Sequence, residues 1–244
     1  MPIQPAIERQ VLACIPTYNE RENLQRLIGA VHAVMPSADV LIIDDNSPDG
    51  TGVLADSIAA RNSRVTVLHR SEKLGLGTAY VEGLRRGLTE SYQFFFQMDC
   101  DFSHDPIHMP QLLRAVGEGG ADVALGSRWI RGSRTENWPI GRRLISRAGS
   151  LYARAVLGGQ IRDFTAGFKC FRRAVLERVP LDVVRTRGYG FNVEMTYRAL
   201  KAGFKVVEVP ITFVDRRAGM SKMSKAIFFE AMKMVWNLRF SRER

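Results

Sequence analysis

An acidic pair that follows an apolar run is the feature of this sequence with the clearest chemical potential. Residues 94–98 carry no charge, and Asp99 and Asp101 come directly after them, with Ser103 and His104 next. Such a run predicts a buried strand, and ligands of open α/β sheets collect where strands end. Two carboxylates at that point suit Mg²⁺ or Mn²⁺, which would in turn carry phosphates. A solvated Asp-x-Asp turn is the alternative that this segment alone leaves open.

Two further predicted strands end in polar residues. Residues 11–15 lead into a Pro-Thr-Tyr loop, and residues 40–43 end in Asp44 and Asp45. Strands that alternate with helices of about 10–15 residues indicate βαβ units and a mostly parallel sheet. The carboxyl ends of these strands should therefore meet along one edge of the sheet. This shared position argues for a site more strongly than any single motif does.

Three local patterns predict how the elements begin, end and face. Asn19 and Glu22 predict the N-cap and capping box of the first long helix. Residues 205–214 alternate around Pro210 and predict one edge strand. Residues 140–157 predict a helix, and its apolar stripe contains Leu144, Ile145, Ala148, Leu151 and Val156.

Charge is distributed unevenly along the chain. Residues 1–127 hold 10 Lys/Arg and 16 Asp/Glu, a net charge of −6. Residues 128–244 hold 25 Lys/Arg and 9 Asp/Glu, a net charge of +16. A basic half predicts an anionic partner: a nucleic acid, an anionic lipid or a phosphorylated substrate. The composition leaves these three open.

Cysteine spacing and hydropathy predict a reducing compartment and no membrane-spanning helix. Cys14, Cys100 and Cys170 show no paired spacing, which favours free thiols over a disulfide framework or a zinc site. No run of about 18 apolar residues occurs. The final predicted helix, residues 223–240, combines apolar residues with lysines and a tryptophan, which fits either a helix in a bilayer interface or a core helix with one wet face.

Several blocks, in order, carry a resemblance to a known family. They are residues 15–24 (Ile-Pro-Thr-Tyr-Asn-Glu-Arg-Glu-Asn-Leu), 44–51, 74–80, the Asp99-Cys100-Asp101 motif, and Val214-Asp215-Arg216 with Ser221-Lys222. The sequence resembles the family-2 glycosyltransferases, and among them the dolichol- or polyprenol-phosphate mannose synthases of the type that has only a catalytic domain. Cys100 stands where the family usually has Ala, and Leu125 stands where processive polysaccharide synthases have the Gln before Arg-Trp, which counts against a polymerase.

The resemblance implies the fold and the domain arrangement. It implies an α/β GT-A fold, which is Rossmann-like, with a mostly parallel central sheet flanked by helices and a C-terminal amphipathic helix. Residues 1–222 would form the catalytic domain, with a donor half at about 10–127 and an acceptor half at about 128–222. Residues 223–244 would form the amphipathic, membrane-interfacial helix.

The resemblance also implies an activity and a set of site residues. The activity is inverting transfer of mannose from GDP-mannose to a polyprenyl monophosphate with Mg²⁺ or Mn²⁺ as cofactor. Asp99 and Asp101 would hold the metal, Arg128, Arg142 and Ser146 would hold the acceptor phosphate, and Asp101 and Arg128 would be catalytic. The donor would be bound by Pro16, Tyr18, Glu20, Ile43, Asp45, Asp99, Cys100, Arg128, Arg216 and Lys222.

Further residues and partners complete these expectations. Asp163 and Glu194 lie in family-like blocks and are expected to orient loops or the acceptor arginines, whereas His69, His104 and His108 show no ligand spacing and are interpreted as bystanders. The expected location is peripheral, on the cytoplasmic face of an anionic membrane, with room for a small transmembrane anchoring subunit.

Two other functions compete with this one. The first is a polyprenyl-phosphate glucosyltransferase that uses UDP-glucose. The second is a basic nucleic-acid-binding module, which explains the basic half but not the acidic strand ends. A dinucleotide-binding dehydrogenase is disfavoured because Gly75 and Gly77 follow the third strand and Tyr80 stands in place of the third glycine.

Overall fold

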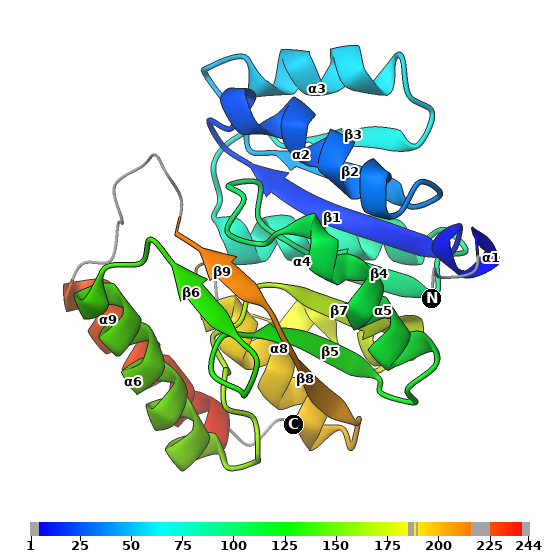
Figure 1. The fold of residues 1–244 in the computed structure, drawn as a ribbon. Coiled ribbons are helices and arrows are strands. Elements are labelled where there is room, and N and C mark those ends of the chain that lie inside the picture. The colour runs from blue at the N-terminus through cyan, green and yellow to red at the C-terminus, as the bar shows by residue number, and fades with distance from the viewer. Residues whose placement is uncertain (1–4, 185–187, 189, 216–224, 241–244) are drawn as a thin grey trace.

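The computed structural model of the protein describes residues 5–184, 188, 190–215 and 225–240. Among these residues one large sheet contains, in spatial order, β3 (Val65–His69), β2 (Asp39–Asp44), β1 (Val11–Thr17), β4 (Phe94–Gln97), β7 (Lys169–Arg172), β5 (Val123–Ser127) and β8 (Val206–Pro210) (Figure 1). Strands β3, β2, β1 and β4 are parallel to one another, as are β5 and β8, whereas β7 is antiparallel to both of its neighbours. The predicted mostly parallel sheet is confirmed.

Helices cover both faces of this sheet. The remaining elements are α1 (Pro5–Glu8), α2 (Arg21–Val34), α3 (Thr51–Ala59), α4 (Leu76–Leu88), η1 (Pro106–His108), α5 (Met109–Gly117), α6 (Ile140–Leu157), α7 (Arg173–Arg178), η2 (Leu181–Val183), α8 (Gly190–Lys201) and α9 (Lys225–Phe240). Apolar residues of α2, α3 and α5 form one core, and those of α4, α7 and α8 form the other. The result is the three-layered α/β arrangement that a buried parallel sheet requires.

Strand β1 shows how the sequence builds these two cores. Its side chains alternate: Val11, Ala13 and Ile15 enter one core, and Leu12 and Cys14 enter the other. A strand buried on both faces must be apolar throughout, which explains why the segment shows no polar alternation. Its polar continuation therefore begins only where the strand leaves the sheet.

The predicted capping box of Asn19 and Glu22 is wrong. Helix α2 begins at Arg21 with Glu20 as its N-cap residue, and the Glu20 side chain caps no backbone N–H of the first turn. The backbone N–H of Glu20 instead donates to the hydroxyl of Thr51 at 3.0 Å. A side chain from the next βα loop thus binds this backbone group, and a local sequence pattern cannot reveal such a partner.

The single edge strand predicted for residues 205–214 is also wrong, although β8 does lie at the edge of the large sheet. The chain leaves that sheet after Pro210 and forms β9 (Thr212–Val214), which pairs with β6 (Arg134–Glu136) in a second sheet. Ile211 makes the transition, because its N–H donates to the carbonyl of Ser127 and its carbonyl accepts from Arg134. Proline offers no N–H to continue the first ladder.

Helix α6 has the predicted bounds, but most of its apolar stripe does not face a core. Its buried residues are Ser150, Ala153 and Leu157, in the C-terminal half of the helix. Leu144 and Leu151 are 62% and 64% exposed. Figure 1 shows α6 beside α9, at one side of the large sheet rather than across it.

Candidate active site

The carboxyl ends of β1, β2 and β4 meet at one edge of the sheet, as predicted. β1 lies between its two partners, and all three run in the same direction. In the register of the sheet Pro16 lies opposite Ile43, and Cys14 lies opposite Gln97. The residues that follow each strand therefore emerge next to one another. These residues include Tyr18, Asp45 and Asp99.

The two acids that follow β2 have different roles. Asp44 is buried and accepts hydrogen bonds from the hydroxyls of Thr17 and Ser47, so it ties the strand ends together. Asp45 is also buried and accepts from Nη1 of Arg70 at 2.5 Å. Burial raises the pKa of Asp45, and the Arg70 contacts oppose that rise only in part. Arg70 thus sets the position and charge of a predicted donor-binding residue.

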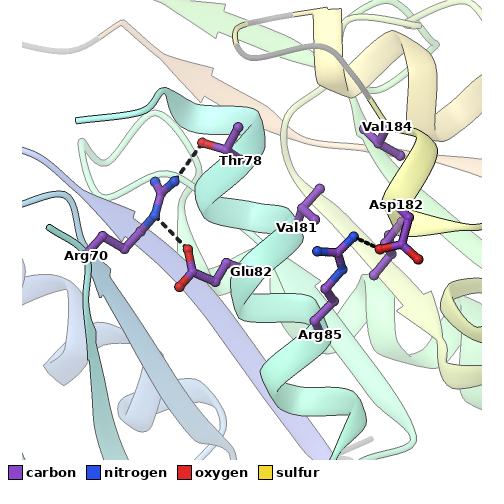
Figure 2. A pocket seen from close by; sticks show the side chains of 8 residues that line it. Arg70, Thr78, Val81, Glu82, Arg85, Asp182 and Val184 are labelled. Carbon is purple, nitrogen blue, oxygen red and sulfur yellow. Dashed lines mark hydrogen bonds and ion pairs between the residues drawn. The ribbon is translucent and has the colours of Figure 1, made fainter. Parts of the chain in front are cut away.

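Arg70 is a functional candidate that sequence reasoning missed. Figure 2 shows its side chain between Thr78 and Glu82 of α4, to which it donates hydrogen bonds at 2.8 Å each. These residues line one side of a recess of about 330 Å³, and the ion pair of Arg85 with Asp182 lies on the other side. Arg70 comes directly after β3, so its place at a strand end was the available signal.

The loop after β1 contributes Tyr18 and Glu20. Nζ of Lys73 lies 3.6 Å from the centroid of the Tyr18 ring, a cation–π contact between two loops of the sheet edge. Glu20 accepts a hydrogen bond from the amide of Asn23 at 2.8 Å. The charge of Glu20 also adds to the rise in the pKa of Cys100 that burial causes, which places this loop near the Asp-x-Asp motif.

The Asp99-Cys100-Asp101 motif is held by hydrogen bonds on both sides. The hydroxyl of Tyr80 donates to Oδ1 of Asp99 at 2.8 Å, and Oδ1 of Asp101 accepts from the N–H of Ser103 at 3.0 Å. The Cys100 side chain is only 2% exposed and belongs to the core. The predicted contact of Cys100 with the donor stays a prediction.

His104 is wrongly interpreted as a bystander. It is buried, and its Nδ1 accepts a hydrogen bond from the backbone N–H of Asp99 at 3.0 Å. Burial lowers the pKa of His104, which keeps the ring neutral and able to accept at Nδ1. The ring stacks on Phe168 with the centroids 5.3 Å apart and meets the edge of Phe213. His104 therefore connects the acidic motif to β9.

Arg128 and Asp163 form an ion pair whose side chains are only 10% and 0% exposed. Nε and Nη2 of Arg128 each donate to Asp163 at 2.7 Å, the backbone N–H of Arg128 adds a third bond, and Nη2 also donates to Thr165. Burial alone would raise the pKa of Asp163, but the Arg128 charge and hydrogen bonds outweigh burial and lower the pKa. Asp163 thus orients Arg128, as the sequence reasoning expected.

The other acceptor candidates have different surroundings. Nη1 of Arg142 donates to Asp215 at 2.6 Å. Ser146 lies one turn further along α6 and is partly exposed. Glu194 pairs with Arg198 of its own helix, and its expected role in orienting loops or the acceptor arginines stays a prediction. Arg216 and Lys222 lie outside the described residues.

The Asp99-Cys100-Asp101 motif could hold a divalent cation only if substrate and water supply the remaining ligands. Among the residues that the structure describes, no group of three or more His, Cys, Asp or Glu side chains is placed to hold a metal ion. Mg²⁺ commonly binds through one or two carboxylates and completes its shell with substrate phosphates and water. Asp99 and Asp101 fit that pattern. They do not fit a closed structural site.

Within residues 5–184, 188, 190–215 and 225–240, none of the helices combines the length and hydropathy that crossing a bilayer requires. In α9, Val235 is buried, whereas Trp236 and Phe240 are 54% and 61% exposed.

The chain belongs to glycosyl transferase family 2, whose family model matches residues 12–179. The protein is therefore a glycosyltransferase, and the predicted family is confirmed.

Two relatives show which glycosyltransferases the chain resembles. The chain is 47% identical over 234 residues to the polyprenol monophosphomannose synthase of Mycolicibacterium smegmatis, an alignment that covers 95% of this chain and 88% of the relative. It is 48% identical over 231 residues to the undecaprenyl-phosphate mannosyltransferase of Micrococcus luteus, with 94% of each covered.

A solved structure confirms the GT-A fold. Glucosyl-3-phosphoglycerate synthase from Mycobacterium tuberculosis, in complex with Mn²⁺, UDP-glucose and phosphoglyceric acid, matches with a TM-score of 0.69. The match covers 100% of this chain and 86% of that chain at 16% identity. At this identity the similarity establishes the fold and nothing about substrates.

Proposed function

We propose that this glycosyltransferase transfers mannose from GDP-mannose to a polyprenyl monophosphate and inverts the anomeric centre. The observation that carries the proposal is the position of Asp99 and Asp101 just beyond β4, with Arg128, which follows β5 in the same sheet, held by Asp163. The two relatives whose names specify mannosyl transfer to a lipid phosphate or polyprenol support the choice of substrates.

The donor is assigned to the ends of β1, β2 and β4. Pro16, Tyr18, Glu20, Ile43 and Asp45 surround the position of the guanosine, and Arg70 fixes the Asp45 carboxylate. We extend this donor half over residues 10–127 and the acceptor half over 128–222. Arg216 and Lys222, which lie outside the described residues, are assigned to the donor phosphates by resemblance alone.

The acidic motif is assigned to a metal-assisted departure of the diphosphate. Asp99 and Asp101 would hold Mg²⁺ or Mn²⁺, which as a Lewis acid stabilises the charge that develops on the leaving group. Tyr80 and His104 keep the motif in one conformation through their bonds to the side chain and backbone of Asp99. Such supporting contacts orient ligands before substrate arrives.

The acceptor is assigned to Arg128, Arg142 and Ser146. A phosphate monoester is largely ionised near neutral pH, because its second pKa is about 6, so its oxygen needs no strong general base. Nε and Nη2 of Arg128 donate to Asp163 and Thr165, so Nη1 is the guanidinium nitrogen that we assign to the acceptor phosphate. Attack of the phosphate oxygen on the anomeric carbon forms one C–O bond while the bond to the GDP oxygen breaks.

Peripheral membrane association is part of this proposal, because a polyprenyl chain resides in a bilayer. Support comes from the balance of +16 over residues 128–244 and from exposed apolar side chains on α6 and α9. Each Lys or Arg near an anionic surface contributes about 1 kcal/mol. We place the enzyme on the cytoplasmic face, with the terminal helix (residues 223–244) at the interface and with room for a small transmembrane anchoring subunit.

The decisive experiment measures transfer of radiolabelled mannose from GDP-mannose to polyprenyl phosphate in detergent, with and without EDTA. We expect activity only when Mg²⁺ or Mn²⁺ is present, and a large loss in Asp101→Ala. Equal activity with and without EDTA, and in the variant, would remove the metal from the mechanism. Preferential transfer from UDP-glucose in a parallel reaction would establish the competing donor instead.

A further inference from the structure

One face of α6 carries apolar and basic side chains that no element in the described part of the chain covers. Ile140, Leu144, Arg147, Leu151 and Arg154 follow one another at spacings of four, three, four and three residues, so they share one face of the helix. The apolar members are exposed, Ile140 by 76%. Four of the large hydrophobic residues that are exposed in the described part of the chain belong to this one helix. Such a concentration marks an interaction surface.

Beside this face lies a recess lined mainly by arginines. It has a volume of about 300 Å³, and its lining residues are Trp129, Arg147, Leu151, Arg154 and Arg162. In the described residues none of the three arginine side chains forms an ion pair with a carboxylate. Arg128 and Arg142, by contrast, are both paired with aspartates. Positive charge in the recess is therefore available to an anionic ligand.

We propose that this recess binds the phosphate headgroup of an anionic phospholipid while Ile140, Leu144 and Leu151 enter the bilayer interface. Guanidinium groups match phosphate oxygens in pairs of hydrogen bonds, and a helix with apolar and cationic side chains on one face lies in the interface plane. The inference rests on the membrane association in the proposed function and assigns that association to one surface. The headgroup is distinct from the reacting acceptor phosphate.

Trp129 connects the recess to the acceptor site. Its ring lies 5.8 Å from the Arg128 guanidinium carbon and 5.9 Å from that of Arg147. Trp138 stacks on Trp129 with the centroids 5.7 Å apart. A headgroup bound at Arg147 would therefore hold Arg128 at the level of the lipid phosphates. The acceptor phosphate lies at that level.

A phospholipid accounts for both components of the surface. A free phosphate would use the arginines but would leave the leucines and Ile140 in water. Nucleic acid would likewise meet three exposed aliphatic side chains with no aromatic platform of the single-strand type on the helix face. Only a bilayer offers anionic phosphates and an apolar layer next to each other.

The test measures binding of the full chain, without substrates, to phosphatidylcholine vesicles with and without phosphatidylglycerol. The variant Arg154→Gln/Arg162→Gln removes two recess arginines, and we expect its affinity for the anionic vesicles to fall by about 30-fold. The matched control is Arg9→Gln/Arg61→Gln, which removes two exposed arginines near α1 and α3, on the far side of the molecule from α6 in Figure 1. We expect near wild-type binding of this control, because attraction to a charged surface is screened over a Debye length of about 8 Å.

A second variant tests the apolar part. Leu144→Ser/Leu151→Ser should weaken binding to neutral and anionic vesicles alike, and its fold should persist because both side chains are exposed. Equal binding of wild type and both variants would overturn the proposal. So would saturable binding of inorganic phosphate at the recess without any preference for anionic vesicles, or tighter binding to single-stranded DNA than to the vesicles. The vesicle-binding experiments use no substrate. A failure of mannosyl transfer in detergent would therefore contradict the proposed function without changing the vesicle-binding results.

Discussion

The two halves of the molecule handle charge in opposite ways. In the N-terminal half, acids at the ends of parallel strands are surrounded by neutral or single basic partners: Tyr80 and His104 for Asp99, and Arg70 for Asp45. In the C-terminal half, arginines outnumber acids, and only some have carboxylate partners. The first half keeps its polar groups on a rigid buried sheet, whereas the second exposes apolar and basic groups on α6.

This difference follows from the two substrates that we propose. A nucleotide sugar is soluble and must be placed to within a fraction of an ångström, which strand ends on a packed sheet can achieve. A lipid phosphate stays in its bilayer, so the protein must present its binding groups outward. Arg128 lies at the boundary: it is enclosed by Asp163 and by aromatic rings, and it follows β5.

The largest effect on stability is expected at this boundary. Asp163→Asn leaves the Arg128 guanidinium enclosed without a charged partner, and we expect a loss of about 3–5 kcal/mol in the free energy of unfolding, measured in urea. The matched control is Asp182→Asn, because the Arg85–Asp182 pair is exposed, and it should change stability by less than about 1 kcal/mol. Similar losses in the two variants would show that the Arg128 pair is no more enclosed in solution than a surface pair.

The Arg128–Asp163 ion pair predicts that the free energy of unfolding depends on pH. Since the folded-state pKa of Asp163 lies below its unfolded value of 3.8, its contribution is complete above pH 3.8 and is lost as the pH falls through the folded-state pKa. The stability difference between wild type and Asp163→Asn should therefore shrink in acid. A difference that stays constant down to the acid transition would contradict the lowered pKa.

The next largest effect is expected on catalysis in the first half. Asp101→Ala should reduce kcat by about 10²–10³, the loss seen when one group that stabilises a developing charge is removed. Asp56→Ala removes an exposed carboxylate of α3 and should stay near wild-type activity. A kcat of Asp101→Ala within a few-fold of the control would mean that this acid does not act on the leaving diphosphate.

A smaller effect on activity is expected when a hydrogen bond that holds the Asp99-Cys100-Asp101 motif is removed. His104→Ala deletes the acceptor for the Asp99 N–H, and we expect the metal concentration for half-maximal activity to rise by about 10- to 100-fold. His69→Ala, at an exposed histidine paired with Asp56, serves as the control. If His104→Ala loses stability but keeps its metal dependence, the histidine serves packing alone.

A separate pH dependence of stability concerns Lys169, on strand β7, which lies between β4 and β5. Nζ donates to the carbonyl of Asn192 at 2.7 Å, and burial lowers the pKa of Lys169 from 10.5 to about 7. Because the unfolded chain binds this proton more tightly, the free energy of unfolding should increase as the pH rises from about 7 to 10.5.

Lys169→Met tests this slope, since it removes the titrating group and keeps an unbranched apolar stem. The variant should show a flatter pH dependence of unfolding over that range, measured by urea titration at several pH values. Lys205→Met, at an exposed lysine, should leave the slope unchanged. Identical slopes in wild type and Lys169→Met would show that Lys169 does not titrate in that range.

Local patterns in the amino-acid sequence determined the elements, the parallel strands and the acidic ends of β2 and β4. Apolar runs that are followed by Asp45 or Asp99 can be recognised without tertiary information. The residues of a buried strand must be apolar, and polar residues begin where the chain meets solvent or a ligand. The motif blocks were sufficient to identify the family, which its model then matched over residues 12–179.

The tertiary structure alone decided which partner each charged group acquires. Arg70 reaches Asp45 from 25 residues away, and Arg128 reaches Asp163 from 35 residues away. The position of β7 between β4 and β5 brings together strands that are distant in sequence. The periodicity of apolar residues along the chain does not predict this pairing. The exposure of α6 is likewise invisible in its stripe of apolar residues, since a pattern shows that a helix has an apolar face but not whether another element covers it.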